Sequence, residues 1–419
     1  MKKVLFLTTR LIYPVNDGRK VVLYNYCKGL ELYHDCEVRL FSILDDEEKR
    51  VEQPTFISKV YYGSLPNKLE KIMNLSIKSV LLNKWPLQVS LYYSKKTKKN
   101  LDEVINEYNP DVVICDMART AEYFKDLNDE KYNKILDMDD ILSKRYKRQM
   151  ESGELGKDAV GAYASKLPKC FDKWIDRFSA MKYILGKEVK ILSKYEEKIS
   201  QYYRNIVFVS PLEAKEFGYL LGEAEKTIDI TIGVDYSYFS QEIIQEKIQN
   251  SIVFLGNMHV SHNKDAVNHF LENIYPGILK EIPNAKLIIV GRCPEDYKNH
   301  LLRFSNIEVT GEVDDIRLHV KKCSVAIAPL LYGSGIKTKI LETMAMGIPV
   351  VTNDIGIEGI ALTDGENILV ANTSEDFINK TIDLLINREL NNKILCNAKR
   401  FIQENHQWKD ILKKFEGIL

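Results

Sequence analysis

The side chains best suited to chemistry are a glutamate and two lysines that follow a pair of glycines late in the chain. Gly333 and Gly335 lie in a loop, and Lys337, Lys339 and Glu342 come next. Glycine lets a backbone approach its ligand closely, and the first amides of a helix attract a diphosphate. A carboxylate near such an anion needs hydrogen-bond donors, which ribose hydroxyls supply. We therefore expect a nucleotide site here, with a solvated helix glutamate paired with Thr338 or Lys339 as the alternative.

A strand, a loop and a helix must hold these side chains in place, and residues 325–359 have that pattern. Residues 325–329 form an apolar run of strand length. Residues 337–346 carry apolar side chains at helical spacing, and Gly347 followed by Pro349 ends a helix. A second strand comes after the proline. The pattern predicts one unit of an α/β sheet with its glycine loop beside the start of a helix.

The sequence GSGIKTKILETMAMGIPVV, residues 333–351, resembles the donor-binding signature of retaining glycosyltransferases of family 4, which have the two-domain GT-B fold. The resemblance makes Glu342 the second glutamate of the signature, which grips the ribose of the nucleotide. The first glutamate of the family falls at Ser334, so this chain departs from the pattern there. The Gly-Ile-Lys-x-Lys variant is similar to a subgroup of transferases associated with polysaccharides.

A second glycine loop follows the apolar strand that opens the C-terminal domain. In the resembling family this loop supplies an arginine directly after the glycine and a lysine further on, and both neutralise the donor diphosphate. Here Asn257 follows Gly256. A cation is still required because the leaving nucleoside diphosphate gains negative charge in the transition state. The available substitutes are Lys264, Lys337 and Arg292.

The resemblance implies further donor contacts at the ends of neighbouring strands, where Gly311 and Val313 would flank the base. The full predicted donor set is Gly256, Asn257, Arg292, Gly311, Val313, Ser334, Gly335, Ile336, Lys337 and Glu342. The predicted catalytic set is Gly18, Lys264, Lys337 and Glu342.

The N-terminal domain begins with another strand, loop and helix. An apolar strand at 3–8 is followed by a loop around Gly18 and a helix over about 21–32. The carboxyl end of such a strand is a ligand-binding edge. The resemblance implies that Gly18 faces the donor phosphates and the acceptor, with Asp17 and Arg19 beside it. The alternative for Arg19 is a surface charge at the start of the helix.

Acidic residues follow two later strands of the same domain. Asp116 ends one strand, and Asp137, Asp139 and Asp140 end the next. Three acids within four residues suggest a metal site, but no histidine is near, and the resembling family generally works without a bound metal. We expect no metal and no cofactor, since the nucleotide diphosphate sugar is a substrate. The predicted acceptor-side set is Asp17, Arg19, Asp116, Asp139 and Asp140, with helix capping as the alternative for the last two.

A basic amphipathic helix is predicted over residues 68–84. Its apolar face would carry Leu69, Ile72, Met73, Ile77, Val80 and Leu81, with lysines elsewhere. Such a helix either rests on an anionic membrane surface or, more commonly, covers a sheet. The lysine-rich run at 95–99 favours the membrane.

The composition sets limits on location and partners. The 59 basic residues balance the 59 acidic residues, so no overall charge attracts nucleic acid. The seven cysteines have no Cys-x-x-Cys spacing, which argues against a zinc site or a disulfide framework. No apolar run is long enough to span a bilayer, and the N-terminus lacks the features of a signal peptide. We expect a cytoplasmic protein, with the inner face of a membrane as an option.

Together these features predict an α/β protein of GT-B fold, with two Rossmann-like doubly wound domains facing across a cleft. The acceptor-side domain would span 1–235 and the donor domain 236–404, with a C-terminal helix at 405–419 packing back on the first domain. The implied function is a retaining, hexose-transferring glycosyltransferase. It would move a sugar from a nucleotide diphosphate sugar to a glycan or lipid-linked acceptor in surface polysaccharide biosynthesis.

Two other functions stay open. A nucleotide-sugar epimerase of the same fold would act on the donor alone. A catalytically silent homologue, acting as a partner subunit, would explain Ser334 and Asn257.

Overall fold

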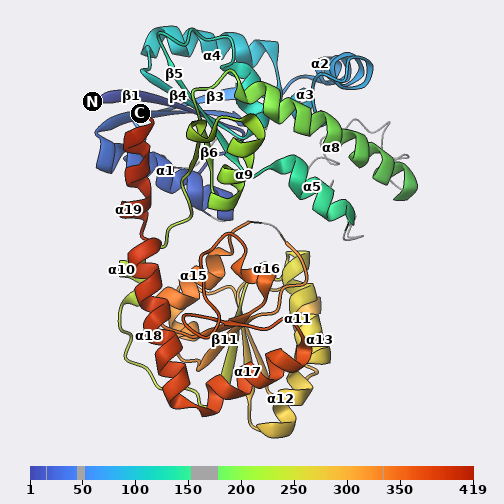
Figure 1. Ribbon diagram of the computed structural model, residues 1–419, viewed down its shortest axis with the longest axis vertical. Helices are drawn as coiled ribbons and strands as arrows, with labels where there is room; N and C mark the ends of the chain where they lie inside the picture. The colour runs from blue at the N-terminus through green and yellow to red at the C-terminus, as the bar shows by residue number, and fades with distance from the viewer. Residues whose placement is uncertain (16, 45–51, 152–177, 334) are drawn as a thin grey trace. The chain divides into compact units, whose positions relative to one another are not determined.

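The computed structural model describes residues 1–15, 17–44, 52–151, 178–333 and 335–419 (Figure 1). The chain forms two compact units. Unit 1 comprises Met1–Thr231 together with Leu412–Leu419, and unit 2 comprises Ile232–Ile411. Each unit contains one parallel sheet with helices packed around it, as the prediction of two doubly wound domains requires.

The sheet of unit 1 has the strand order β3-β2-β1-β4-β5-β6-β7, and each neighbouring pair is parallel. Its strands are β1 (Lys2–Thr8), β2 (Cys36–Leu44), β3 (Lys59–Ser64), β4 (Val112–Asp116), β5 (Asn133–Asp139), β6 (Asn205–Phe208) and β7 (Thr227–Asp229). The order reverses between β1 and β4, and ligands of such sheets bind at that switch point, outside the carboxyl ends of the strands.

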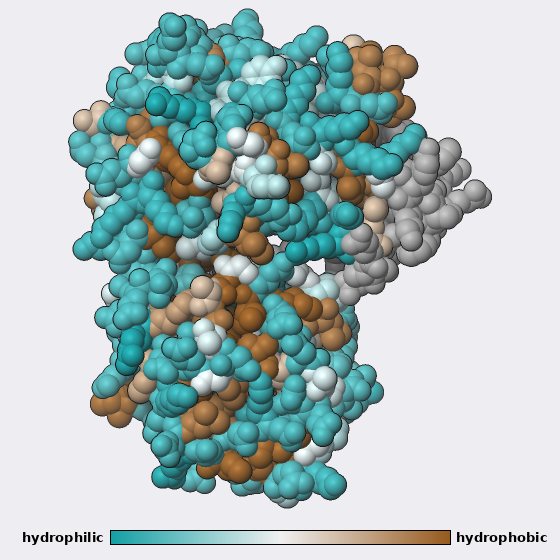
Figure 2. All heavy atoms as spheres, viewed as in Figure 1, coloured by the Kyte–Doolittle hydropathy of each residue, from teal (hydrophilic) through white to brown (hydrophobic). Residues whose placement is uncertain are grey.

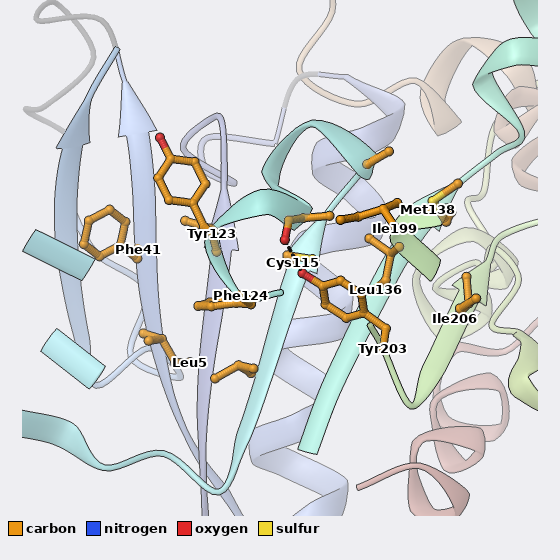
Figure 3. Close-up of a cluster of buried hydrophobic side chains, with 14 of the residues drawn as sticks. Leu5, Phe41, Cys115, Tyr123, Phe124, Leu136, Met138, Ile199, Tyr203 and Ile206 are labelled. Atoms are coloured by element: carbon orange, nitrogen blue, oxygen red, sulfur yellow. Dashed lines mark hydrogen bonds between the residues drawn. The ribbon is translucent and has the colours of Figure 1, made fainter. Parts of the chain in front are cut away.

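The helices of unit 1 cover the sheet and bury its apolar side chains. They are α1 (Gly18–His34), α2 (Lys68–Met73), the π-helix η1 (Asn74–Leu81), α3 (Leu87–Tyr92), α4 (Lys95–Tyr108), the 3-10 helix η2 (Ala118–Tyr123), α5 (Leu142–Glu151), α8 (Phe178–Ser200), α9 (Pro211–Leu221) and the 3-10 helix η4 (Ala224–Lys226). Figure 3 shows the core between sheet and helices, where the Tyr203 hydroxyl crosses to the carbonyl of Ala121 at 2.6 Å. Buried hydroxyls of this kind need such partners.

The sheet of unit 2 has the order β10-β9-β8-β11-β12-β13, again with parallel neighbours. Its strands are β8 (Ser251–Leu255), β9 (Lys286–Val290), β10 (Ile307–Gly311), β11 (Val325–Ala328), β12 (Val350–Thr352) and β13 (Leu369–Val370). The order reverses between β8 and β11. The predicted donor loops therefore follow the two strands at the switch point.

The helices of unit 2 include the one predicted after the glycine pair. They are α10 (Tyr236–Ser240), α11 (Ser261–Asn273), α12 (Tyr275–Glu281), α13 (Glu295–Leu301), α14 (Arg317–Val320), α15 (Thr338–Ala345), α16 (Asp354–Ile357), α17 (Ser374–Ile386) and α18 (Arg388–Asn405). The chain then continues through α19 (Trp408–Leu412) into the 3-10 helix η5 (Lys413–Gly417). Among the described residues, no helix combines the length and apolar character needed to cross a membrane.

The last residues of the chain are anchored in unit 1. The ring of Phe415 meets the ring of Tyr26 edge-on, with 5.2 Å between centroids. The carbonyl of Leu412 lies 2.7 Å from Nε2 of His34, at the end of α1. This end of the chain therefore contributes to the core beside α1.

The helix predicted over 68–84 is present as α2 and η1, but the expectation that its apolar face covers a sheet is wrong. Leu69 is 75% exposed and Leu81 is 73% exposed. The side of this helix that faces the protein carries Leu75 and Ser79 instead. Helical periodicity finds the apolar face, but it does not indicate whether protein or solvent covers that face.

Candidate functional site

The start of α15 is the centre of the candidate donor site. Lys337 occupies the capping position, and its side chain makes no capping bond, so among the described residues the first amides of α15 have no side-chain acceptor. Gly335 has φ of 75°, a backbone conformation that glycine adopts without strain. Across the loop, Nζ of Lys337 donates to the carbonyl of Gly335 at 2.7 Å. The predicted residue Ser334 lies outside the described residues.

Glu342 lies on the second turn of α15 and is partly buried. Among the described residues, none donates a hydrogen bond to its carboxylate or forms an ion pair with it. Burial raises the pKa of Glu342 to about 7. The alternative of a surface pair with Lys339 is wrong, because Lys339 has another partner. A buried carboxylate without donors is costly, so this group is suited to a ligand that brings hydroxyls.

Lys339 turns away from Glu342 toward the first strand of unit 2. Its Nζ donates to Oδ1 of Asn263 at 2.7 Å and lies 4.6 Å from the ring centroid of Phe254. Burial, together with the charge of Lys337, lowers the pKa of Lys339 to about 7. Lys339 therefore links β8, α11 and α15. With a pKa of about 7, its amine changes charge near neutral pH.

The glycine loop after β8 joins the same neighbourhood. A Cβ at Gly256 would lie 3.1 Å from Cγ of Asn263, the residue that accepts from Lys339. Nδ2 of Asn263 donates to the carbonyl of Asn257 at 2.9 Å. The side chain of Asn257 accepts from the backbone N–H of His259 at 2.9 Å. Asn257, which stands where the family has an arginine, thus holds the loop in shape.

Three strand ends of unit 2 are brought together by glycine. A Cβ at Gly291, after β9, would come within 2.2 Å of the carbonyl oxygen of Gly256, and its φ is 133°. Gly291 also pairs with Gly311 at the end of β10. Val313 is half-buried just beyond. The predicted donor positions Gly256 and Gly311 are therefore neighbours through Gly291, which is absent from the predicted donor set.

Two of the predicted cations already have protein partners. The guanidinium of Arg292 donates to Oε1 of Glu312 at 2.8 and 2.5 Å, and both side chains are more than half exposed. Nζ of Lys264 lies 5.2 Å from the ring centroid of Tyr297. Lys339, whose charge the sequence places beside the glycine pair, is absent from the predicted substitutes for the arginine. The signal was its position three residues before Glu342, on the same stretch of helix.

The predicted acceptor-side residues of unit 1 meet around Arg19. Its guanidinium donates to Oδ1 of Asp116 at 2.7 and 3.0 Å, to Oδ2 of Asp137 at 2.7 Å and to Oδ1 of Asp139 at 2.9 Å. Arg19 is only 8% exposed, so the alternative of a surface charge is wrong. The cluster joins the start of α1 to the ends of β4 and β5. Asp137, which the predicted acceptor set omits, is a full member.

The pKa values of the acids in this cluster are shifted in opposite directions. Burial would raise the pKa of Asp116, but Arg19, Arg10 and Arg119 together hold it below its usual value. Burial raises the pKa of Asp137 to about 7, and the charges of Asp116 and Asp139 act in the same direction. One arginine thus neutralises this cluster only in part.

The remaining predicted residues of unit 1 lie around this cluster. Oδ1 of Asp17 accepts from the backbone N–H of Lys20 at 2.9 Å and caps α1. Gly18, the first residue of α1, is exposed, and a Cβ there would meet nothing within 4 Å. Oδ2 of Asp140 pairs with Arg145 at 2.8 Å. Burial raises the pKa of Asp140 to about 6.

Neither Asp139 nor Asp140 supplies the bonds to the first turn of α5. Glu196 of α8 accepts there instead, from the backbone N–H of Ser143 at 3.2 Å and from its hydroxyl at 2.5 Å. Within the described ranges, no group of three or more histidine, cysteine, aspartate or glutamate side chains is arranged to hold a metal ion.

The chain is similar in sequence to several known proteins. Residues 249–387 match the family described as Glycosyl transferases group 1. An uncharacterized 44.6 kDa protein in the cps region of Klebsiella pneumoniae is 24% identical over 429 residues, covering 98% of each chain. An uncharacterized glycosyltransferase of Methanocaldococcus jannaschii is 25% identical over 270 residues, covering 61% of this chain and 63% of the relative.

A solved structure is similar over the whole chain. HepE of Anabaena in complex with UDP has a TM-score of 0.66 at 14% identity, covering 100% of this chain and 99% of that one. The likeness confirms the predicted GT-B fold. Together with the matched family, it supports a glycosyltransferase of GT-B fold.

The raised pKa of Asp137 predicts a distinct pH dependence of stability. Between pH 4 and 7 the folded state retains the Asp137 proton while the unfolded state loses it, so this group lowers the free energy of unfolding as pH rises. Asp137→Asn removes that slope and still offers an oxygen to Arg19. We expect the variant to gain more than about 1 kcal/mol over the parent at pH 8, with the difference shrinking toward pH 4.

Urea unfolding at several pH values measures this difference. The exposed residue Asp314, changed to Asn, is the matched control. A stability difference for Asp137→Asn that stays constant across the pH range would contradict the assignment.

Proposed function

We propose that the chain is a retaining glycosyltransferase of family 4 that transfers a hexose from a nucleotide diphosphate sugar to a glycan or lipid-linked acceptor in surface polysaccharide biosynthesis. The observation that carries this proposal is Glu342. It is a partly buried carboxylate without a protein donor among the described residues, on a helix whose first amides face no capping side chain. Ribose hydroxyls and a diphosphate are the complementary groups.

In this proposal the donor diphosphate lies at the start of α15. The free amides of the helix and the ammonium groups of Lys337 and Lys339 supply positive charge to it. Lys339 replaces the arginine that the family pattern has after the glycine of β8, where Asn257 holds the loop instead. The pKa of Lys339 is about 7 in the free protein. A bound diphosphate would favour its charged form.

The chemical step is the one that the resemblance to retaining glycosyltransferases implies. The acceptor oxygen attacks the anomeric carbon on the face from which the diphosphate departs, so the new bond keeps the original configuration. The bond from that carbon to the diphosphate oxygen breaks, and a diphosphate oxygen takes the proton of the acceptor hydroxyl. Lys337, Lys339 and the α15 amides stabilise the charge that develops on the leaving group. The protein therefore acts mainly by orientation and electrostatics.

The comparisons favour a uridine nucleotide and a polysaccharide acceptor as the first to test. The HepE structure contains UDP, and the Klebsiella relative is encoded in a cps region. The engagement of Asn257, Lys264 and Arg292 within the protein favours one rival, a silent homologue serving as a partner subunit. Turnover of a labelled nucleotide sugar, measured with and without acceptor, distinguishes the three functions. A transferase turns over the donor with acceptor present, an epimerase converts the donor alone, and a silent homologue does neither.

The role of Glu342 is tested by the affinity for UDP. We expect Glu342→Ala to raise the dissociation constant by about 10- to 100-fold, because two ribose hydroxyls lose a charged acceptor worth about 1.5–3 kcal/mol. Isothermal titration calorimetry measures the change, and Glu272→Ala, at an exposed position of α11, is the control. Equal UDP affinity in the Glu342 variant and the control would remove the ribose assignment.

The two shifted pKa values predict a bell-shaped pH dependence of donor affinity. Below pH 7 Glu342 becomes protonated and loses acceptor capacity, while above pH 7 free Lys339 loses its charge. We expect the affinity for UDP-glucose, whose diphosphate keeps its charge in this range, to be greatest near pH 7. Lys339→Met should remove the alkaline limb, and Glu342→Gln should remove the acid limb.

Fluorescence or calorimetric titrations from pH 5.5 to 9 measure both limbs. Lys280→Met, at an exposed position of α12, is the control for lysine loss. An unchanged alkaline limb in Lys339→Met would assign that titration to another group.

A further inference from the structure

A row of large apolar side chains covers the outer side of α2 and η1. The most exposed are Leu69 at 75%, Leu81 at 73% and Val80 at 68%. The complete set, which we call the α2–η1 face, is Leu69, Ile72, Met73, Ile77, Val80, Leu81 and Leu82. In Figure 2 this face is visible as a brown patch at the top right, over the position of α2 in Figure 1. A contiguous apolar patch of this kind marks an interaction site.

The helix is held so that these side chains must point outward. Nδ2 of Asn74 donates to the carbonyls of Ser90 and Tyr93 at 3.2 and 3.0 Å. The hydroxyl of Ser79 lies 2.7 Å from that of Ser90, and both residues are buried. Leu75 is the apolar anchor, packed against a small cluster on α3. The buried side is therefore largely polar and the exposed side apolar, which is the reverse of a helix that covers a sheet.

Positive charge surrounds the α2–η1 face. Residues 67–84 contain four lysines and one acid, Glu70. Oε1 of Glu70 accepts from the backbone N–H of Lys95 at 2.7 Å, which brings the start of α4 beside α2. That start adds more exposed lysines. The exposed or half-exposed lysines of both segments that remain for a partner are Lys68, Lys71, Lys78, Lys84, Lys95, Lys96 and Lys99, whereas Lys98 pairs with Asp102.

Unit 1 has a second set of exposed apolar side chains, on α9, which differs from the α2–η1 face in the charge that surrounds it. On α9, Leu212 is 57% exposed and Leu220 is 54% exposed. The charged residues of that helix are two glutamates and one lysine, Glu213, Glu216 and Lys215. That surface lacks the excess of positive charge found around the α2–η1 face. The two helices therefore form a natural matched pair for an experiment.

We propose that the α2–η1 face docks on the surface of an anionic lipid bilayer. Its apolar side chains would enter the boundary between headgroups and acyl chains, and the surrounding lysines would contact lipid phosphates. The occupant is a membrane surface rather than a protein because apolar exposure and one-sided positive charge coincide. The proposal rests on unit 1 alone and holds whether or not the glycosyltransferase proposal is correct. It would bring a lipid-linked acceptor to the enzyme.

Flotation with lipid vesicles tests the proposal on the full chain. The vesicles contain either phosphatidylcholine alone or phosphatidylcholine and phosphatidylglycerol in equal parts. We expect binding to the anionic vesicles that weakens with added salt, and much less binding to the neutral ones. The double variant Leu69→Gln with Leu81→Gln should lower the partition coefficient by about tenfold or more, since two inserted side chains become polar. Leu212→Gln with Leu220→Gln should leave it unchanged.

A second pair of substitutions separates charge from apolar insertion. Lys68→Gln with Lys71→Gln should weaken binding to anionic vesicles and reduce its salt dependence. Circular dichroism and thermal melting show that each variant is folded, which is expected because the changed side chains are exposed or half-exposed. UDP affinity in the same variants should equal that of the parent, so the donor site is assessed separately.

The proposal is overturned if the parent chain does not bind anionic vesicles, or if the Leu69 and Leu81 variant binds as well as the α9 control. It is also overturned if the parent forms a dimer that the same variant abolishes, without vesicle binding. In that case the occupant is a second copy of the chain.

Discussion

The candidate site of unit 2 depends on two charged groups of α15, Glu342 and Lys339, which are held partly out of water and do not neutralise each other. No ion pair joins them among the described residues, and burial brings both pKa values to about 7. A free ion pair would satisfy both groups and leave nothing for a ligand. Here the carboxylate of Glu342 has no donor among the described residues, and the ammonium group of Lys339 donates to the side-chain oxygen of Asn263. In the proposed complex, ribose hydroxyls would donate to Glu342, and the diphosphate would pair with the ammonium group of Lys339.

In unit 1, by contrast, the buried charged side chains pair with one another. Asp116, Asp137 and Asp139 come from two adjacent strand ends and close on one guanidinium, that of Arg19. Arg19 neutralises these acids only in part, but its hydrogen bonds to all three fix the start of α1 against the sheet. The same edge of a parallel sheet thus carries a closed charge cluster in one unit and an open one in the other. We propose the open cluster as the anion-binding site.

The sequence was sufficient for the fold, because the fold follows from local patterns. Apolar runs followed by glycine loops located the strands that flank each switch point. The same patterns placed Glu342 on the helix after Gly335, while its role at a ribose stays a prediction. Partners were not predictable in the same way. Arg292 pairs with Glu312, and Lys264 lies on Tyr297, through contacts between separate elements. Periodicity likewise found the apolar face of α2 and η1 but not its exposure, since that depends on the neighbouring helices.

The most direct measurement of the central claim is a thermal-shift panel of UDP, GDP, ADP and CMP on the full chain. Binding to the native state adds about 2.7 kcal/mol of stability at a hundredfold excess over the dissociation constant. We expect one nucleoside diphosphate to raise the melting temperature clearly, and CMP, which has a single phosphate, to raise it less. Equal, negligible shifts with all four would contradict a nucleotide site at the start of α15.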